Sequence, residues 1–266
     1  MLTPGMAAEA RKGSPAVPLS IGRTFTIASE VLAETRRINV YLPAGYAESA
    51  VKVPVLYMLD GGMAEDFLHV AGLVQVSVGN GTMRPFLLVG IENTERRRDL
   101  TGPTKNAEDR KIAPRVGGSE AFRRFIRDEL IPEIDARYRT TPERAIVGES
   151  LAGLFVVETF LLEPELFGSY IAIDPSLWWN NEELMKGAAE RLNEGPRPET
   201  VLYLASSGEK GVGATVARFT DILQKRAPAT VRSHHEPMPE ERHLTIYHPA
   251  ALKAFRALFT PPAAKQ

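Results

Sequence analysis

Six short strand candidates, five of them apolar and separated by stretches with helical spacing of apolar residues, limit most strongly what this chain can fold into. They lie at 55–59, 86–91, 145–147, 170–173, 201–205 and 230–235. Continuous apolar runs of this length are typical of strands that are buried on both faces, and their alternation with helices predicts an α/β fold with a mostly parallel central sheet flanked by helices on both faces. Because ligands bind at the carboxyl ends of the strands in such sheets, we expect the functional site at that edge.

Two further segments rich in β-forming residues, Thr24–Ser29 and Arg36–Tyr41, predict an antiparallel hairpin at the start of the fold. The clearest helix is predicted over Ser119–Tyr138, where apolar side chains recur on one face, with a bend at Pro132. The predicted organisation is a flexible N-terminal arm, a single domain and a C-terminal tail. Their bounds are 1–22, 23–260 and 261–266.

Composition excludes several classes of function. The net charge is −1, which argues against a surface for nucleic acid. The sequence contains no apolar run long enough to cross a membrane, and Glu9, Arg11 and Lys12 interrupt the region where a signal peptide would be apolar, so we expect a cytoplasmic protein. There is no cysteine, which excludes disulfides, thiolate metal sites and cysteine nucleophiles. The nucleophile of any covalent chemistry must therefore be an oxygen or a nitrogen.

The sequence GESLAG (148–153) places a serine at the junction of a predicted strand and a helix predicted over 151–162. A nucleophile elbow needs small residues around the serine because the two backbones approach closely at a strained turn, and Gly148, Ala152 and Gly153 meet this requirement. The hydroxyl of Ser150 would then project from the carboxyl edge of the sheet. Serine is also a frequent helix N-cap, so this motif by itself leaves both interpretations open.

A serine hydroxyl becomes a good nucleophile only when a neighbouring base takes its proton, and in this architecture the chain order is serine, acid, histidine. Glu209 lies in a loop after the segment 201–205, and His243 lies in the loop before the last predicted helix. Both are therefore expected at the same edge as Ser150. Asp174, at the end of the segment 170–173, is a competing acid.

His243 is the preferred base among five histidines. His234 and His235 adjoin each other at the end of a predicted strand, before the loop that would carry the base. His248 precedes a proline at the start of the terminal helix, and His69 lies within an earlier predicted helix, so packing roles are expected for both. The sequence shows no histidine or carboxylate spacing typical of a metal site.

Longer segments add information specific to one family. They are VPVLYMLDGG (53–62), NTERRRDLTGPT (93–104), FIRDELIPEIDARYRTTPERAIVGESLAGLF (125–155) and PELFGSYIAIDPSLWWNNEEL (164–184). From about Thr24 to Phe259 the chain resembles the "Putative esterase" family, which includes esterase D, S-formylglutathione hydrolase and the enterochelin (siderophore) esterases. The resemblance implies an α/β-hydrolase fold, no cofactor, and hydrolysis of carboxylic esters through an acyl-enzyme.

The same resemblance implies roles for individual residues. Ser150 would be the nucleophile, His243 the base and Glu209 the acid, with Asp174 as the alternative acid. The backbone amides of Leu151 and Gly62 would form the oxyanion hole. The sequence departs from the family pattern at three positions: Glu149 stands where His or Phe is usual, Ala152 replaces the usual Gly, and Asp174 replaces the common Ser.

Substrate choice is less strongly indicated. Trp178 and Trp179 are expected to line the pocket, and Arg98 and Asp60 are expected to contact the substrate. The absence of a long helical insertion favours small soluble or aryl esters with short acyl chains over emulsified lipid. The alternatives are a siderophore lactone esterase, an acyltransferase of the same fold, or a binding protein that has lost catalysis. The expected partner is a small-molecule ester, with neither nucleic acid nor membrane.

Overall fold

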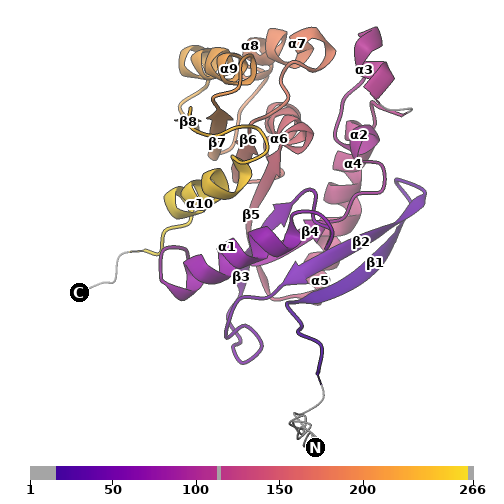
Figure 1. Cartoon of the computed structure of the whole chain (residues 1–266), viewed down its shortest axis with the longest axis vertical. Helices are drawn as coiled ribbons and strands as arrows, with labels where there is room; N and C mark the ends of the chain where they lie inside the picture. Colours follow the sequence, from indigo (N-terminus) through magenta and orange to yellow (C-terminus); the bar gives the residue numbers. More distant parts are fainter. Residues whose placement is uncertain (1–15, 113–114, 263–266) are drawn as a thin grey trace, which may run out of the picture.

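The computed structural model describes residues 16–112 and 115–262. Eight strands form one sheet in the order β1-β2-β4-β3-β5-β6-β7-β8 (Figure 1). β1 and β2 form an antiparallel hairpin, β2 also pairs antiparallel with β4, and all the remaining neighbours are parallel. The strand bounds are β1 Arg23–Ser29, β2 Glu34–Tyr41, β3 Val53–Met58, β4 Leu87–Ile91, β5 Thr140–Glu149, β6 Ser169–Ile173, β7 Thr200–Ser207 and β8 Val231–Met238.

Two hydrophobic clusters fill the spaces on the two faces of this sheet. Alternate residues of the central strands enter different clusters: Tyr57 and Ile146 belong to one, and Met58 and Val147 belong to the other. Helices α1 (Phe67–Gly79) and α10 (Tyr247–Leu258) cover one face. The other face is covered by helices whose bounds are α4 Ser119–Phe125, α5 Ile131–Arg137, α6 Leu151–Leu162, α7 Trp179–Lys186, α8 Ala188–Arg191 and α9 Val212–Arg226. The predicted mostly parallel sheet with helices on both faces is confirmed.

The long helix predicted over 119–138 is present, but it contains a π-helical turn at Ile126–Leu130 between α4 and α5. Pro132 is the second residue after this turn and occupies the first turn of α5. A proline has no amide hydrogen to donate, and its ring clashes with the carbonyl four residues earlier in a regular α-helix. The wider turn relieves this clash, so the bend expected at Pro132 takes the form of a π turn.

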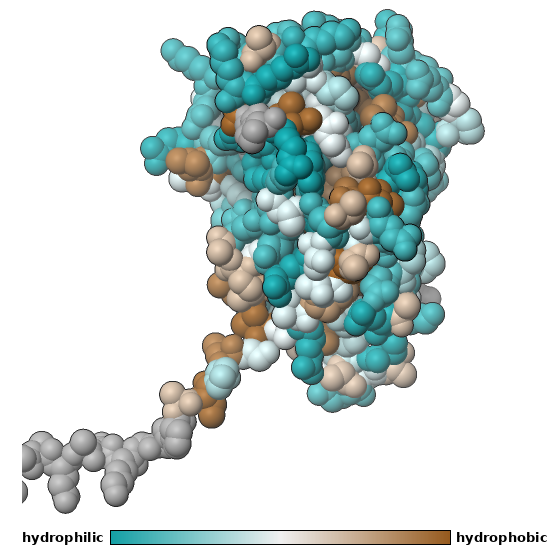
Figure 2. All heavy atoms as spheres, turned by 90° about the vertical axis from the view of Figure 1, so that its right-hand side faces the viewer, coloured by the Kyte–Doolittle hydropathy of each residue, from teal (hydrophilic) through white to brown (hydrophobic). Residues whose placement is uncertain are grey.

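Strand β5 is longer than its predicted core of 145–147. Its first half is largely exposed, with Pro142 and Glu143 on the surface, so the sequence shows no apolar run there. Residues 1–15 of the predicted arm and 263–266 of the predicted tail lie outside the described residues, and residues 16–22 form neither helix nor strand. Across the described ranges, no helix has the length and apolar character that a membrane crossing requires. The face shown in Figure 2 is mostly hydrophilic, with small separate hydrophobic areas.

The parallel arrangement brings several loops to one edge of the sheet. Asp60 follows β3, Ser150 follows β5, Asp174 follows β6 and His243 follows β8. Two short helices, α2 (Arg96–Asp99) and α3 (Ala107–Ile112), follow β4. The edge at which the sequence predicts a site is therefore the edge where these loops meet.

Candidate active site

Ser150 occupies a strained turn between β5 and α6. Its backbone angles are φ 63° and ψ −120°, in a region that non-glycine residues rarely adopt and that costs on the order of 1–3 kcal/mol. The residue stands at the N-cap position of α6, yet among the described residues its hydroxyl makes no capping bond and instead lies 3.0 Å from the Nε2 atom of His243. The structure thus has the geometry of an elbow and not that of a helix cap.

The small residues around Ser150 are required by close backbone contacts. A Cβ atom added to Gly148 would lie 2.7 Å from atoms of Ala152, and one added to Gly153 would lie 3.0 Å from the carbonyl oxygen of Ile173. Both distances are too short for a side chain without movement of the backbone. The expected close approach of strand and helix is confirmed, and the methyl group of Ala152 fits within the turn.

His243 joins Ser150 to a buried carboxylate. Its Nδ1 atom lies 2.7 Å from Oδ2 of Asp174, which leaves Nε2 to face the serine hydroxyl. The hydrogen bond with Asp174 raises the pKa of His243, burial opposes this shift, and the negative charges of Glu149, Asp174 and Glu209 add to it. The imidazole is 29% exposed, so it can exchange protons with a substrate or with water.

Asp174 is held rigidly beneath the imidazole. Its side chain is fully buried and accepts hydrogen bonds from the backbone amide of Ser207 at 2.7 Å and from the Ser207 hydroxyl at 2.8 Å. Burial alone would raise the pKa of Asp174, but the hydrogen bonds from His243 and Ser207 outweigh it and hold this pKa below its ordinary value. Asp174 therefore stays ionised and fixes the orientation of the ring.

Glu209, the acid preferred from the sequence, does not contact the imidazole, whereas Asp174, the alternative acid, does. Its Oε1 atom accepts a hydrogen bond from the backbone amide of His243 at 2.9 Å, so it holds the loop and not the ring. The physical reason is strand order: β6, which precedes Asp174, is the direct neighbour of β5, whereas β7, which precedes Glu209, is one strand farther from Ser150. Chain order alone does not distinguish the two acids.

The two amides expected to form the oxyanion hole differ in their surroundings. Leu151 is the first residue of α6, and among the described residues its amide has no acceptor, as is usual for the first turn of a helix. The amide of Gly62, in contrast, donates to Oε2 of Glu65 at 2.7 Å. In this conformation only the Leu151 amide is free to meet a developing oxyanion.

The four residues expected to contact the substrate are distributed over different environments. Asp60 is buried and paired with Arg96, whose Nε and Nη2 atoms lie 2.6 and 2.8 Å from the carboxylate. Trp179 is 5% exposed and donates from Nε1 to the carbonyl of Gly102, so it forms part of the core, whereas Trp178 is 42% exposed. The structure therefore leaves only Trp178 openly accessible among these aromatic and charged candidates.

Arg98 is engaged away from Ser150. Its guanidinium donates to both oxygens of Glu34 and to the buried carboxylate of Asp99. Arg96, two residues earlier, instead faces Asp60 and also lies 3.4 Å from the backbone oxygen of Glu149. The run of arginines forms one helical turn, so neighbouring side chains point in different directions, and nothing in the sequence shows which of them faces the site.

Glu149 approaches the imidazole closely. Its Oε1 atom lies 3.3 Å from Nε2 of His243, and its side chain is only 17% exposed. Burial raises the pKa of Glu149 to about 7, although His243 and Arg96 act in the opposite direction. The sequence shows that Glu149 departs from the family pattern but does not show that it contacts the imidazole.

Within the described residues, no group of three or more histidines, cysteines or carboxylates is placed to hold a metal ion.

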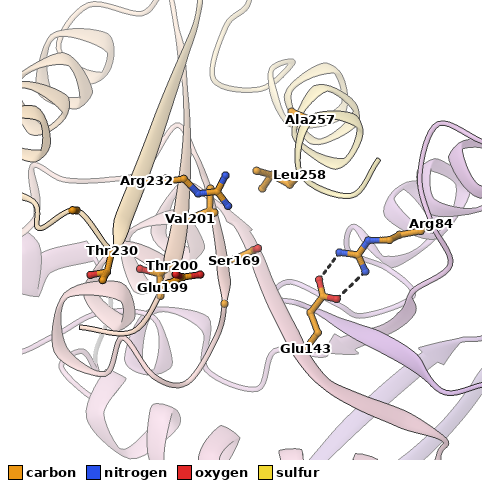
Figure 3. A pocket seen from close by; sticks show the side chains of 12 residues that line it. Arg84, Glu143, Ser169, Glu199, Thr200, Val201, Thr230, Arg232, Ala257 and Leu258 are labelled. Carbon is orange, nitrogen blue, oxygen red and sulfur yellow. Dashed lines mark hydrogen bonds and ion pairs between the residues drawn. The ribbon is translucent and has the colours of Figure 1, made fainter. Parts of the chain in front are cut away.

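A separate cavity of about 570 Å³ lies at the opposite edge of the sheet (Figure 3). Its walls include Ser169, Thr200 and Arg232 at the amino ends of strands β6, β7 and β8, together with Leu258 at the end of α10. Figure 3 shows the ion pair between Arg84 and Glu143 at one side of this cavity. None of the described residues that line it belongs to the group formed by Ser150, His243 and Asp174.

Comparisons with known proteins match this chain to esterases. The model of the family described as "Putative esterase" matches residues 29–247. Ferri-bacillibactin esterase BesA of Bacillus subtilis is 35% identical over 164 residues, which cover 54% of this chain and 52% of BesA. The match therefore spans about half the length of that relative.

Solved structures show the same fold over most of the chain. An IroE-like serine hydrolase from Shewanella oneidensis has a TM-score of 0.81 and 31% sequence identity, and the match covers 90% of this chain and 80% of that protein. The BES protein from Bacillus cereus has a TM-score of 0.80 at 21% identity, with coverage of 94% and 100%. The α/β-hydrolase fold implied by the sequence resemblance is confirmed.

Proposed function

Because the chain belongs to the "Putative esterase" family, we propose that it is a serine carboxylic-ester hydrolase that works through an acyl-enzyme. One observation carries the proposal: the strained Ser150 presents its hydroxyl 3.0 Å from Nε2 of His243, whose other nitrogen lies 2.7 Å from Asp174. In this proposal Ser150 is the nucleophile, His243 is the general base and acid, and Asp174, in place of Glu209, is the acid of the triad.

In the proposed acylation step, Oγ of Ser150 attacks the ester carbonyl while its proton moves to Nε2 of His243. The carbonyl oxygen becomes an oxyanion, which the free amide of Leu151 is positioned to stabilise. Such a donor contributes about 3 kcal/mol to the transition state. The proton on Nε2 then passes to the oxygen of the leaving alcohol as the C–O bond breaks, and the acyl group remains on Ser150.

Deacylation repeats these movements with water in place of the serine. Nε2 takes a proton from the water, the resulting hydroxide attacks the acyl carbonyl, and the proton returns to Oγ of Ser150 as the acid product leaves. Asp174 stabilises the imidazolium that forms in both steps, because its ionised carboxylate faces Nδ1 throughout.

Small soluble or aryl esters with short acyl chains are the proposed substrates. A second candidate is a siderophore lactone, and the observation that favours it is the similarity to BesA, a ferri-bacillibactin esterase. In both candidates the enzyme would cleave a carboxylic ester bond. They differ in the alcohol and acyl groups that must fit beside Ser150.

Hydrolysis of p-nitrophenyl esters from acetate to palmitate, compared with hydrolysis of a catecholate trilactone, tests both candidates. We expect kcat/KM to fall as the acyl chain lengthens. A kcat/KM for the lactone at least about tenfold above that for the acetate would select the siderophore ester instead. Failure of a fluorophosphonate to modify Ser150, together with no turnover of any ester, would refute the proposed esterase.

A further inference from the structure

Glu149 and Ser150 approach the same nitrogen of His243. Nε2 lies 3.0 Å from Oγ of Ser150 and 3.3 Å from Oε1 of Glu149, while Nδ1 faces Asp174 at 2.7 Å. The imidazole is therefore in contact with two carboxylates, one at each nitrogen. A serine, histidine and aspartate alone would place a carboxylate only at Nδ1.

The surroundings of Glu149 leave its carboxylate oriented toward the imidazole. It ends β5 beside Ile173 of β6, so its backbone is fixed by the sheet. The nearby cation, Arg96 of α2, bonds through its guanidinium to Asp60 and reaches only the backbone oxygen of Glu149. Among the described residues, no group donates a hydrogen bond to this carboxylate, and its ion-pair partner is the imidazole.

The charged and titratable groups that influence the pair formed by Glu149 and His243 come from every surrounding element. Asp174 follows β6, Asp60 follows β3, Arg96 belongs to α2, Glu209 follows β7, and Tyr247 begins α10. The carboxylates favour retention of a proton in the pair, whereas Arg96 opposes it. Because Arg96 is paired with Asp60, the net effect of these neighbours is to keep a proton on the pair.

Competition for the Nε2 proton has a direct chemical consequence. The acylation step requires an unprotonated Nε2 that can accept the proton of Ser150. An ionised carboxylate 3.3 Å away favours the imidazolium, in which Nε2 already carries a proton and cannot act as a base. After attack, the same carboxylate stabilises the imidazolium that forms, until the proton passes to the leaving alcohol.

We propose that Glu149 is a positioning residue that shares the Nε2 proton of His243 with Ser150 and thereby sets the pH at which the enzyme becomes active. This inference rests on the proposed esterase function. It adds an influence on the pH dependence of activity that a serine, histidine and aspartate alone do not supply. Glu149 and His243 act as a coupled pair, so the acidic limb of the pH profile reports the pair and not the histidine alone.

The direction of the expected shift follows from the charge. Esterase activity is lost as the pH falls and Nε2 of His243 becomes protonated. The carboxylate of Glu149, whose own pKa burial raises to about 7, favours uptake of the first proton by the pair and so moves this loss to a higher pH. Glu149→Gln removes the charge and keeps a side chain of similar size, so activity should persist to a lower pH. We expect the midpoint of the acidic limb of kcat/KM to fall by about one unit, the shift typical of one nearby charge.

The experiment measures kcat/KM for p-nitrophenyl acetate between about pH 5 and 9 for the wild type, Glu149→Gln and Glu209→Gln. Glu209→Gln is the matched control, because it removes an equal charge from a carboxylate that contacts only the backbone amide of His243. We expect its midpoint to move by less than half as much. The plateau rate of Glu149→Gln should fall several-fold, because the imidazolium of the transition state loses a counter-ion.

An NMR titration of the His243 ring in the Ser150→Ala background separates this inference from the proposed function. The pKa of His243 should fall by about one unit when Glu149→Gln is added, whether or not the protein hydrolyses esters. If the wild type hydrolyses esters and neither the kinetic midpoint nor this pKa moves, Glu149 is not coupled to the imidazole and the inference fails alone. If the ring titration shifts but no ester is hydrolysed, the coupling stands and the proposed function fails.

Discussion

The two edges of the central sheet differ in how their polar side chains are paired. At the carboxyl edge, Ser150, His243 and Asp174 form a chain of hydrogen bonds that ends at a serine in a strained conformation. At the amino edge, the cavity of about 570 Å³ contains an ion pair between Arg84 and Glu143, which neutralises both charges. A large cavity therefore does not by itself mark the site of chemistry. The orientation of proton donors and acceptors marks it more directly.

The largest effect is expected for Ser150→Ala. Without Oγ no acyl-enzyme can form, so kcat/KM for p-nitrophenyl acetate should fall by at least about a thousandfold. Circular dichroism should remain that of the wild type. Ser176→Ala is a matched control, because its hydroxyl lies 3.5 Å from that of Ser150 and it lacks the contact with His243. If Ser176→Ala lost activity and Ser150→Ala retained it, the nucleophile would be Ser176 and the proposed role of Ser150 would be refuted.

The next largest effect is expected for Asp174→Asn. An amide in place of the carboxylate neither stabilises the imidazolium nor holds the required tautomer, and we expect kcat to fall by about 10³- to 10⁴-fold. Glu209→Gln should reduce kcat by less than about tenfold, since Glu209 contacts only the backbone amide of His243. Side-by-side kcat measurements at the plateau pH decide between the two acids. A larger loss in Glu209→Gln would return the acid role to Glu209.

Much of the fold and part of the site follow from sequence patterns. Apolar runs located the central strands, because a strand buried on both faces must be apolar throughout, and the small residues around Ser150 predicted the elbow. The acid was less predictable because both Asp174 and Glu209 follow strands at the correct edge. The choice between them depends on strand order in the sheet, which is a long-range property that local sequence does not encode.

The occupied amide of Gly62 illustrates a second limit of sequence patterns. The turn after β3 is present as expected, but the carboxylate of Glu65, three residues along the chain, accepts the hydrogen bond of this amide. Resemblance to a family indicates which backbone atom takes part in an oxyanion hole. It does not indicate which side chain competes for that atom, because the competition depends on the rotamer of one residue.

Glu65→Ala is expected to change the carboxyl edge moderately. It frees the Gly62 amide and removes a negative charge, while the turn remains held by the bonds from the Gly61 amide to Ile91 and from Asn39 to the Gly61 oxygen. If Gly62 is the second oxyanion donor, kcat for p-nitrophenyl acetate should rise several-fold. This is less than the roughly 100-fold value of a complete donor, because the wild-type carboxylate can also move aside.

Glu65→Gln provides the control for this variant. It keeps an oxygen that can accept from Gly62 and removes only the charge, so its kcat should rise less than that of Glu65→Ala. A fall in kcat in both variants, with unchanged thermal stability, would show that the Glu65 carboxylate orients the turn for catalysis. Gly62 would then not act as the second oxyanion donor that the family resemblance implies.

The smallest effect is expected at the amino edge. Arg232 lines the cavity there with Thr200, and the two side chains come from β8 and β7 at the ends opposite to the catalytic loops (Figure 3). Arg232→Ala should leave kcat/KM for p-nitrophenyl acetate within about twofold of the wild type, because surface substitutions away from buried networks usually change little. A tenfold or larger loss without loss of stability would show that the two edges are coupled. The cavity would then have to be considered part of the catalytic apparatus, and pairing of local groups would no longer suffice to distinguish the two edges.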